Sequence, residues 1–192
     1  MLSSGKLLPC NGFDMVIRAL PLIADAEFVV IGDAENGDLQ SDPEARRLRK
    51  LAKQLGVADR LRLNAGAAAD EMPALLRSAD VVVCPPAYES SGNVALEAMA
   101  CGVPVIASAV GALADTVVHE VTGCVVGRQH PRELAAAVNS LLRDSFLRRS
   151  LGAAGRDRTV ARYTWDRIAA DTAHLYAKSM QAYSREPTAA SG

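Results

Sequence analysis

A single glutamate in an apolar stretch is the side chain of this sequence that most needs a chemical explanation. Glu97 lies within VALEAMA, at positions 94–100, where every other residue is apolar. A carboxylate in such a setting costs free energy unless a partner compensates it. A pair of sugar hydroxyls is one such partner, and a structural arginine or a main-chain amide is another. The spacing alone leaves both interpretations open.

The loop before this glutamate combines an acid with small residues that suit an anionic ligand. Glu89 is followed by Ser90, Ser91 and Gly92, and a helix is expected to begin near Asn93. A helix start offers free main-chain N–H groups and about half a positive charge. Small residues there let a phosphate approach the backbone closely. The segment therefore predicts an anion site about one helical turn before Glu97.

Short apolar runs alternate with amphipathic stretches along the chain, and this alternation sets the fold class. Strands are predicted at 27–32, 61–64, 81–84, 103–107 and 123–126, and helices at 13–24, 43–55, 70–78, 93–100 and 131–142, with mostly helix after 131. Such alternation predicts an α/β fold with a doubly wound parallel sheet. Ligands of these sheets bind outside the carboxyl ends of the strands, which is where the loop before Asn93 would lie.

The composition excludes several classes of protein. A chain of 192 residues can form one domain with a full core, or two small domains. Its 21 basic and 22 acidic residues give a net charge of -1, and aromatic residues make up 4%, which argues against a nucleic-acid partner. The longest uncharged stretch, 98–114, is broken by glycine and proline, so no membrane span is expected. Without a signal peptide, the expected location is cytoplasmic.

Two further patterns have simple interpretations. Cys10, Cys84, Cys101 and Cys124 form no C-x-x-C pair and have mainly apolar neighbours, so they are predicted to be small buried hydrophobic residues. The run RRLRK at 46–50 predicts the exposed face of a helix, with the binding of a polyanionic partner as the alternative.

The segment from Glu89 onward resembles the E-x7-E signature of retaining glycosyltransferases. The resemblance is to the group 1 or family 4 type, which has the GT-B architecture. Glu89 and Glu97 take the places of the two glutamates, and LEAMACGVPV follows at 96–105. SAVGALADTVV at 108–118 and VTG at 121–123 also match, as do GKL at 5–7, NG at 11–12 and VVIGDA at 29–34. The resemblance therefore covers nearly the whole chain.

The resemblance implies a donor-binding domain of Rossmann type over 1–182 with a helical C-terminal extension, followed by a flexible polar tail at 183–192. The chemistry would be transfer of a sugar from a nucleoside-diphosphate sugar to an acceptor. Glu89 would be the catalytic residue that faces the donor sugar, and Glu97 would accept hydrogen bonds from the ribose hydroxyls. Residues 61–66 would lie beside the base.

The resemblance also implies the groups that bind the diphosphate. Gly92, Asn93 and Val94 would present main-chain amides, next to Ser91. Lys6 and Asn11 stand where the family usually carries arginine and lysine against the diphosphate. The nucleotide sugar would be the co-substrate, and no cofactor or metal would be needed. The absence of an Asp-x-Asp motif and of a His/Cys cluster agrees with this.

Some positions depart from the family pattern. Lys6 keeps the charge of arginine but lacks its planar fork, and Asn11 has no charge at all. Ser91 stands where the family often has phenylalanine, so it either adds a hydrogen bond or marks a relaxed site. The alternative is therefore a non-catalytic, degenerate donor domain that acts as a binding or interaction module. A sugar-nucleotide epimerase of GT-B architecture is a third, weaker interpretation.

GT-B enzymes have two domains, and this chain matches only the second. The N-terminal acceptor domain is expected to be absent and the first strand of the donor domain to be shortened, so the isolated chain should bind a donor weakly without turning it over. The helices near the C-terminus cross back to the other domain in GT-B proteins. Trp165 in this region is expected either to pack in the core or to contribute to that interface.

Overall fold

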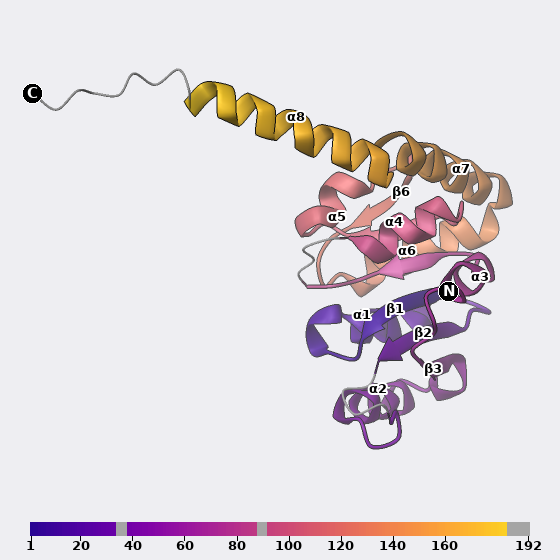
Figure 1. Ribbon diagram of the computed structural model, residues 1–192. Coiled ribbons are helices and arrows are strands. Elements are labelled where there is room, and N and C mark those ends of the chain that lie inside the picture. The colour runs from indigo at the N-terminus through magenta and orange to yellow at the C-terminus, as the bar shows by residue number, and fades with distance from the viewer. Residues whose placement is uncertain (34–37, 88–91, 184–192) are drawn as a thin grey trace, which may run out of the picture.

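The computed structural model describes residues 1–33, 38–87 and 92–183, and it places one parallel sheet between two layers of helices (Figure 1). Its strand order is β3-β2-β1-β4-β5-β6. The strands are β1 (Leu2–Lys6), β2 (Phe28–Asp33), β3 (Leu61–Ala65), β4 (Val82–Cys84), β5 (Val105–Ser108) and β6 (Gly123–Val126). The predicted doubly wound α/β fold is confirmed. The order reverses between β1 and β4, which is where such sheets bind ligands.

The first strand, β1, lies in the middle of the sheet between β2 and β4. All five residues of β1 pair with β2, and Leu2 also pairs with Val82 of β4. The pattern hides this strand because LSSGK contains only one large apolar residue. Ser3 tolerates burial in this strand because its hydroxyl donates a hydrogen bond of 2.5 Å to the Val83 main-chain oxygen.

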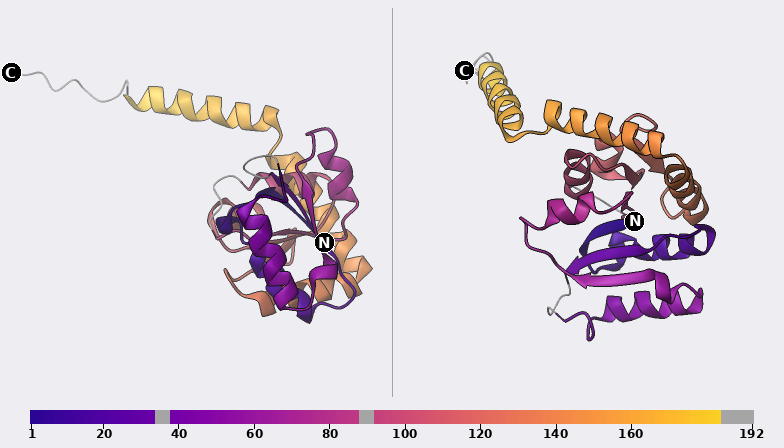
Figure 2. Two further views of the ribbon diagram at one scale, coloured as in Figure 1. Left: turned by 90° about the horizontal axis from the view of Figure 1, so that it is seen from below. Right: turned by 90° about the vertical axis from the view of Figure 1, so that its right-hand side faces the viewer.

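Helices cover both faces of the sheet (Figure 2). One layer contains α1 (Phe13–Ala19), α2 (Pro43–Gln54) and α6 (Pro131–Arg143), and the other contains α3 (Met72–Arg77), α4 (Asn93–Ala100) and α5 (Gly111–Thr116). Helix α1 ends earlier than expected, and a 3-10 turn, η2 (Leu20–Leu22), follows it. Pro21 explains the change because it lacks the N–H group that would continue the α-helix.

Two C-terminal helices complete the described chain. Helix α7 (Ser145–Arg162) packs against α4 and α6, and it approaches the turn after α4 so closely at Gly152 that a Cβ atom there would overlap the Gly102 carbonyl. Helix α8 (Trp165–Tyr183) projects from the body of the molecule (Figure 1). Trp165 is 85% exposed, so the expectation that it packs in the core is wrong. The predicted tail, 183–192, lies outside the described residues apart from Tyr183, the last residue of α8.

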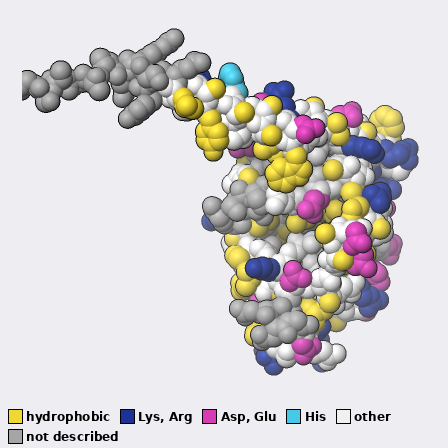
Figure 3. Space-filling view, viewed as in Figure 1, with side chains coloured by type: hydrophobic (Ala, Val, Ile, Leu, Met, Phe, Trp, Pro, Cys, Tyr) yellow, Lys and Arg dark blue, Asp and Glu magenta, His cyan; other side chains and the backbone are white. Residues whose placement is uncertain are grey.

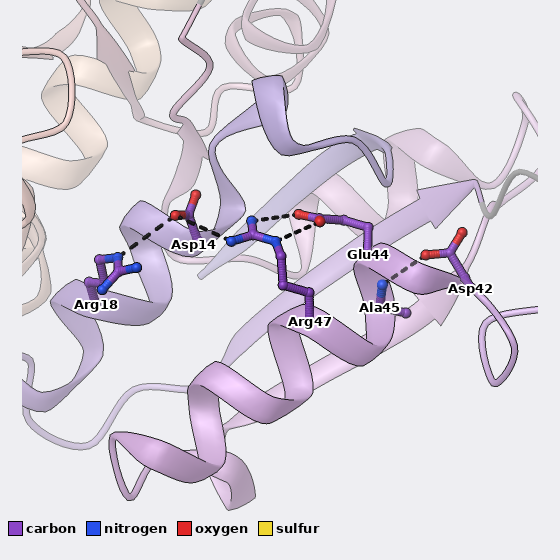
Figure 4. Close-up of polar contacts among 6 residues, drawn as sticks. All are labelled: Asp14, Arg18, Asp42, Glu44, Ala45 and Arg47. Atoms are coloured by element: carbon purple, nitrogen blue, oxygen red, sulfur yellow. Dashed lines mark hydrogen bonds and ion pairs between the residues drawn. The ribbon is translucent and has the colours of Figure 1, made fainter.

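An ion-pair network joins α1 to α2 (Figure 4). The Arg47 guanidinium donates two hydrogen bonds of 2.7 Å to Glu44, whose side chain is buried, and its other nitrogen lies 3.8 Å from an Asp14 oxygen on α1. Asp14 also lies 3.7 Å from Arg18. Hydrogen bonding to Glu44 raises the pKa of Arg47 above its ordinary value. The network therefore ties the start of α1 to the helix beside it.

The four cysteines are free thiols with different exposures. Cys84 is buried, as predicted, whereas Cys101 and Cys124 are only half-buried and pack against the edge of the core. Cys10 is exposed, so the prediction is wrong for this residue. It lies in the 3-10 turn η1 (Pro9–Asn11), which contributes no residue to the core. Within the described ranges, no helix has the length and apolar character needed to cross a bilayer.

Candidate functional site

A cavity of about 110 Å³ lies where the strand order reverses. Gly5 of β1 and Cys84 of β4 contribute to its floor, Asn11 contributes from the turn after β1, and Gly92 and Val94 contribute from the start of α4. Two loops that are distant in the sequence therefore meet around one hollow. This is the position at the carboxyl ends of the strands where the sequence placed a ligand.

The loop after β1 and the loop after β4 touch directly at Gly12. This residue has a left-handed backbone conformation, with φ of 71°, and a Cβ atom on it would overlap the carbonyl oxygen of Pro85. A hydrogen bond of 2.8 Å from the Ala87 amide to the Cys10 main-chain oxygen joins the same two loops. Glycine is needed here because both the backbone conformation and the close approach exclude a side chain.

Lys6 and Asn11 lie close together, but they present different groups. Lys6 is the last residue of β1 and is exposed beside the lining residue Gly5. The Asn11 side chain lines the cavity, and its Nδ2 atom donates a hydrogen bond of 2.6 Å to the main-chain oxygen of Lys6. Asn11 therefore holds the turn that carries Lys6, and it leaves one amide hydrogen for a ligand.

Helix α4 begins at the cavity with a glycine, Gly92, as its N-cap residue. Gly92 is buried at its N-cap with φ of 68°, and a Cβ atom there would lie 3.3 Å from the Thr116 hydroxyl of α5. The first helical hydrogen bond runs from the Leu96 amide to the Gly92 carbonyl at 3.0 Å. The amides of the first turn, 93–95, precede any helical acceptor. Val94 and Ala95 line the cavity, so this end of the helix dipole faces it.

Glu97 lies on the exposed side of α4, one turn beyond Asn93. Among the residues that the structure describes, no cation or amide contacts its carboxylate, so the structural partner that the sequence allowed is not found there. Partial burial raises the pKa of Glu97 above its ordinary value. A carboxylate with this unfavourable desolvation would gain free energy from a ligand that donates hydrogen bonds to it.

The structure brings together part of the predicted site. Asn11, Gly92 and Val94 line the cavity, and the exposed residues Lys6 and Asn93 adjoin lining residues. Glu89 and Ser91 lie outside the described residues. Residues 61–66, expected beside the base, include β3 at the outer edge of the sheet, with β2 between it and β1.

Sequence reasoning missed several residues that line the cavity, and two of them carry large apolar side chains. Phe13 and Leu113 both contribute to it, although each is buried and has the pattern of an ordinary core residue. Leu113 belongs to α5, a helix of six residues that the apolar pattern does not predict. The position of Phe13 directly after the Asn-Gly pair was the one available signal for its location.

The cavity is too small to hold a nucleotide sugar by itself. Its volume of about 110 Å³ is well below the roughly 300–1,000 Å³ of small-molecule sites. A larger ligand anchored in it would therefore extend over the exposed side of α4, which carries Asn93 and Glu97.

Known proteins resemble this chain over most of its length. Residues 1–158 match the family described as glycosyl transferases group 1. The D-inositol 3-phosphate glycosyltransferase of Salinispora tropica is 37% identical over 183 residues, which cover 92% of this chain and 37% of that protein. This chain therefore spans well under half the length of that relative.

Two solved structures have the same fold. Sucrose-phosphate synthase from Thermosynechococcus elongatus matches with a TM-score of 0.83 and 33% identity, over 94% of this chain and 46% of that one. The C-terminal domain of a group 1 glycosyltransferase from Francisella tularensis matches with a TM-score of 0.74 and 29% identity, over 85% of this chain and 86% of that one. The fold described above therefore also occurs as a C-terminal domain that crystallises separately.

Proposed function

Because this chain belongs to the group 1 glycosyltransferase family, we propose that it is the donor-binding part of a retaining glycosyltransferase. Residues 1–182 bind a nucleoside-diphosphate sugar, whose sugar is then transferred to an acceptor. One observation carries the proposal: the cavity between β1 and β4 meets the start of α4, and Glu97 lies unpaired among the described residues one turn along that helix.

The diphosphate is assigned to the start of α4. The amides of Gly92, Asn93 and Val94 and the positive end of the helix dipole attract its charge. Lys6 adds a cation, which about 4 Å from a phosphate contributes roughly 1–4 kcal/mol between water-like and protein-surface dielectric. These groups stabilise the charge that grows on the leaving diphosphate, and the proposal requires no metal ion.

The ribose is assigned to Glu97 and the donor sugar to Glu89. Two ribose hydroxyls donating to the two oxygens of Glu97 would compensate the desolvation that raises its pKa. Glu89 and Ser91 precede the start of α4 in the chain, and we assign them to the hydroxyls of the donor sugar. Retention of the anomeric configuration belongs to this part of the proposal, and NMR of the glycosylated product would test it.

We assign a second domain to the side of the molecule where the strands end, over the cavity. Trp165, Ile168, Leu175 and Tyr176 are exposed apolar residues on α8, and their successive spacings of three, seven and one residues place them on one side of the helix. Helix α8 projects on the side where the strands end, and apolar side chains follow it along its length (Figures 1 and 3). An acceptor-binding domain that covers the cavity would also bury this surface. The greater length of the relatives supports such a domain.

Titration calorimetry with a panel of nucleoside diphosphates tests the donor-binding proposal. We expect at least one of them to bind the 192-residue chain, with binding lost in Glu97→Ala. Asp157→Asn is the control, because Asp157 is an exposed acid on α7 outside the candidate site. Failure of every nucleotide to bind would contradict the proposal.

The alternative is a degenerate donor domain that serves as an interaction module. The Asn11 side chain favours it, because this side chain holds the Lys6 carbonyl and brings no charge to the cavity. The calorimetric panel separates the two functions, since an interaction module of this kind would bind none of the nucleotides.

A further inference from the structure

Helix α2 carries a row of cations on its outward face. Arg46, Lys50 and Lys53 follow one another at spacings of four and three residues, so they lie on the same side of the helix, and all three are exposed. None of them forms an ion pair within 4.0 Å in the described part of the chain. The row spans about 10 Å along the helix axis.

The other two cations of α2 have partners within the fold. Arg47 pairs with Glu44 and Asp14, and Arg49 donates a hydrogen bond of 2.8 Å to the Leu39 main-chain oxygen. The three cations of the row are therefore the basic residues of α2 for which the described residues provide no ion-pair or hydrogen-bond partner. The net charge of the whole chain is -1, so the row is not a consequence of a generally basic composition.

The position and chemistry of the row select the kind of partner. Helix α2 lies at the outer edge of the molecule, next to β3, in both Figures 1 and 2. Among the large apolar residues that are exposed in the described chain, only Leu55 adjoins this helix. Protein interfaces depend on buried aromatic and apolar anchors and are depleted in lysine, so this face is poorly suited to a protein partner. It also lacks the aromatic residues on which bases stack.

We propose that Arg46, Lys50 and Lys53 dock the chain on the surface of an anionic phospholipid bilayer. Long, flexible cations along a convex edge can each reach a different headgroup of a fluid surface, without a preformed pocket. Each basic residue near such a surface increases membrane partitioning about fivefold. With α2 against the bilayer, the carboxyl ends of the strands would face along the membrane rather than into it (Figure 1).

Co-sedimentation with vesicles tests this proposal. The 192-residue chain should sediment at low salt with phosphatidylcholine vesicles that contain phosphatidylglycerol, but not with vesicles of phosphatidylcholine alone. NaCl at about 1 M, where the Debye length is about 3 Å, should release it. The variant with Arg46→Gln, Lys50→Gln and Lys53→Gln should show a partition coefficient roughly a hundredfold lower, since about fivefold is lost for each cation.

A matched variant distinguishes the effect of these three positions on vesicle binding from the effect of a lower net charge. Arg132→Gln, Arg143→Gln and Arg149→Gln together remove the same charge from exposed positions on α6 and α7, and we expect a change within about threefold. A variant with Arg46→Lys, Lys50→Arg and Lys53→Arg keeps the charges and should bind like the original chain. Equal loss in the row and control variants would overturn the proposal. Retention on duplex DNA at a salt concentration that releases the vesicles would also overturn it and assign the row to nucleic acid.

Discussion

The side-chain amide of Asn11 donates a hydrogen bond of 2.6 Å to the main-chain oxygen of Lys6. The sequence suggested that these two residues act side by side on a diphosphate. In the structure, the Asn11 side chain instead holds the backbone of Lys6. Asn11 stabilises the turn from which Lys6 projects, and Lys6 supplies the charge. An uncharged residue at position 11 therefore retains a defined role beside the cavity.

Substitutions of Asn11 should separate this support from ligand binding. Asn11→Ala removes the hydrogen bond and should lower the free energy of unfolding by about 1 kcal/mol. Asn11→Lys loses the same bond but adds a cation, and it should tighten binding of a nucleoside diphosphate by about fivefold or more. Urea denaturation and calorimetry measure the two effects.

Asn139 provides a control for both changes. It donates a similar hydrogen bond of 2.9 Å to the Leu22 main-chain oxygen, but it lies on α6 outside the cavity lining. Asn139→Ala should cost a similar amount of stability, and Asn139→Lys should leave nucleotide affinity unchanged. Equal effects of lysine at both positions would contradict the placement of the diphosphate near Asn11.

Gly12 should be the least replaceable glycine of the site. Gly12→Ala forces a side chain into a left-handed backbone conformation and against the Pro85 carbonyl. Gly56→Ala is the matched control, because Gly56 has a similar φ of +69° and nothing within 4 Å of its Cβ position. The control should cost about 1–2 kcal/mol of unfolding free energy for the conformation alone, and Gly12→Ala roughly 1–3 kcal/mol more for the overlap. Similar costs in urea denaturation would show that the two loops separate easily at Gly12.

The apolar pattern was sufficient to predict most of the sheet, and it failed where polar atoms or proline determine the structure. Helix α4 begins and ends at the predicted residues because small and apolar side chains fill it between two glycines. The predicted strand at 103–107 starts later, at Val105, directly after Pro104, which lacks the N–H group for a sheet hydrogen bond. Strand β1 was underestimated because its buried Ser3 satisfies its hydroxyl across the sheet, which no periodicity reveals.

The sequence was sufficient to predict which segments form the candidate site, but not which side-chain contacts they make there. The family resemblance placed Lys6, Asn11 and the start of α4 around one diphosphate. The alternation of strands and helices does not by itself fix the strand order that brings the loops after β1 and β4 together. The direction of the Asn11 side chain depends on the turn geometry, which the sequence does not encode in a simple pattern. The exposure of Trp165 depends on where α8 leaves the body, and the amphipathic pattern of a helix does not specify what it packs against.

Removal of Arg47 should destabilise the chain through the partner that it leaves behind. Arg47→Met leaves the Glu44 side chain, which is 7% exposed, without its two hydrogen bonds. We expect a loss of about 1–3 kcal/mol in unfolding free energy, less than for a fully buried pair because Arg47 itself is 42% exposed. The double variant with Glu44→Gln should recover part of this loss in urea denaturation. Strictly additive effects would mean that the pair contributes little.

Glu97→Gln should weaken nucleotide binding without weakening the fold. The substitution removes the charge that burial disfavours, so the melting temperature at neutral pH should be unchanged or higher. The loss of charged hydrogen bonds to a ribose should raise the dissociation constant of a nucleoside diphosphate about tenfold to a hundredfold. A lower melting temperature together with unchanged affinity would indicate that Glu97 stabilises the structure instead.

The raised pKa of Glu97 also predicts opposite pH dependences for stability and binding. Above the ordinary pKa of glutamate, the folded chain holds this proton more tightly than the unfolded chain does. The contribution of Glu97 to stability therefore falls as the pH rises from that ordinary value through the raised one. Binding should become tighter over the same range, because the ionised carboxylate is the better acceptor for ribose hydroxyls.

Melting temperatures and calorimetric affinities should be measured across this pH range for the original chain and for Glu97→Gln. Relative to Glu97→Gln, the original chain should lose melting temperature and gain nucleotide affinity as the pH rises. Parallel curves for the two proteins would contradict the assignment of the ribose to Glu97.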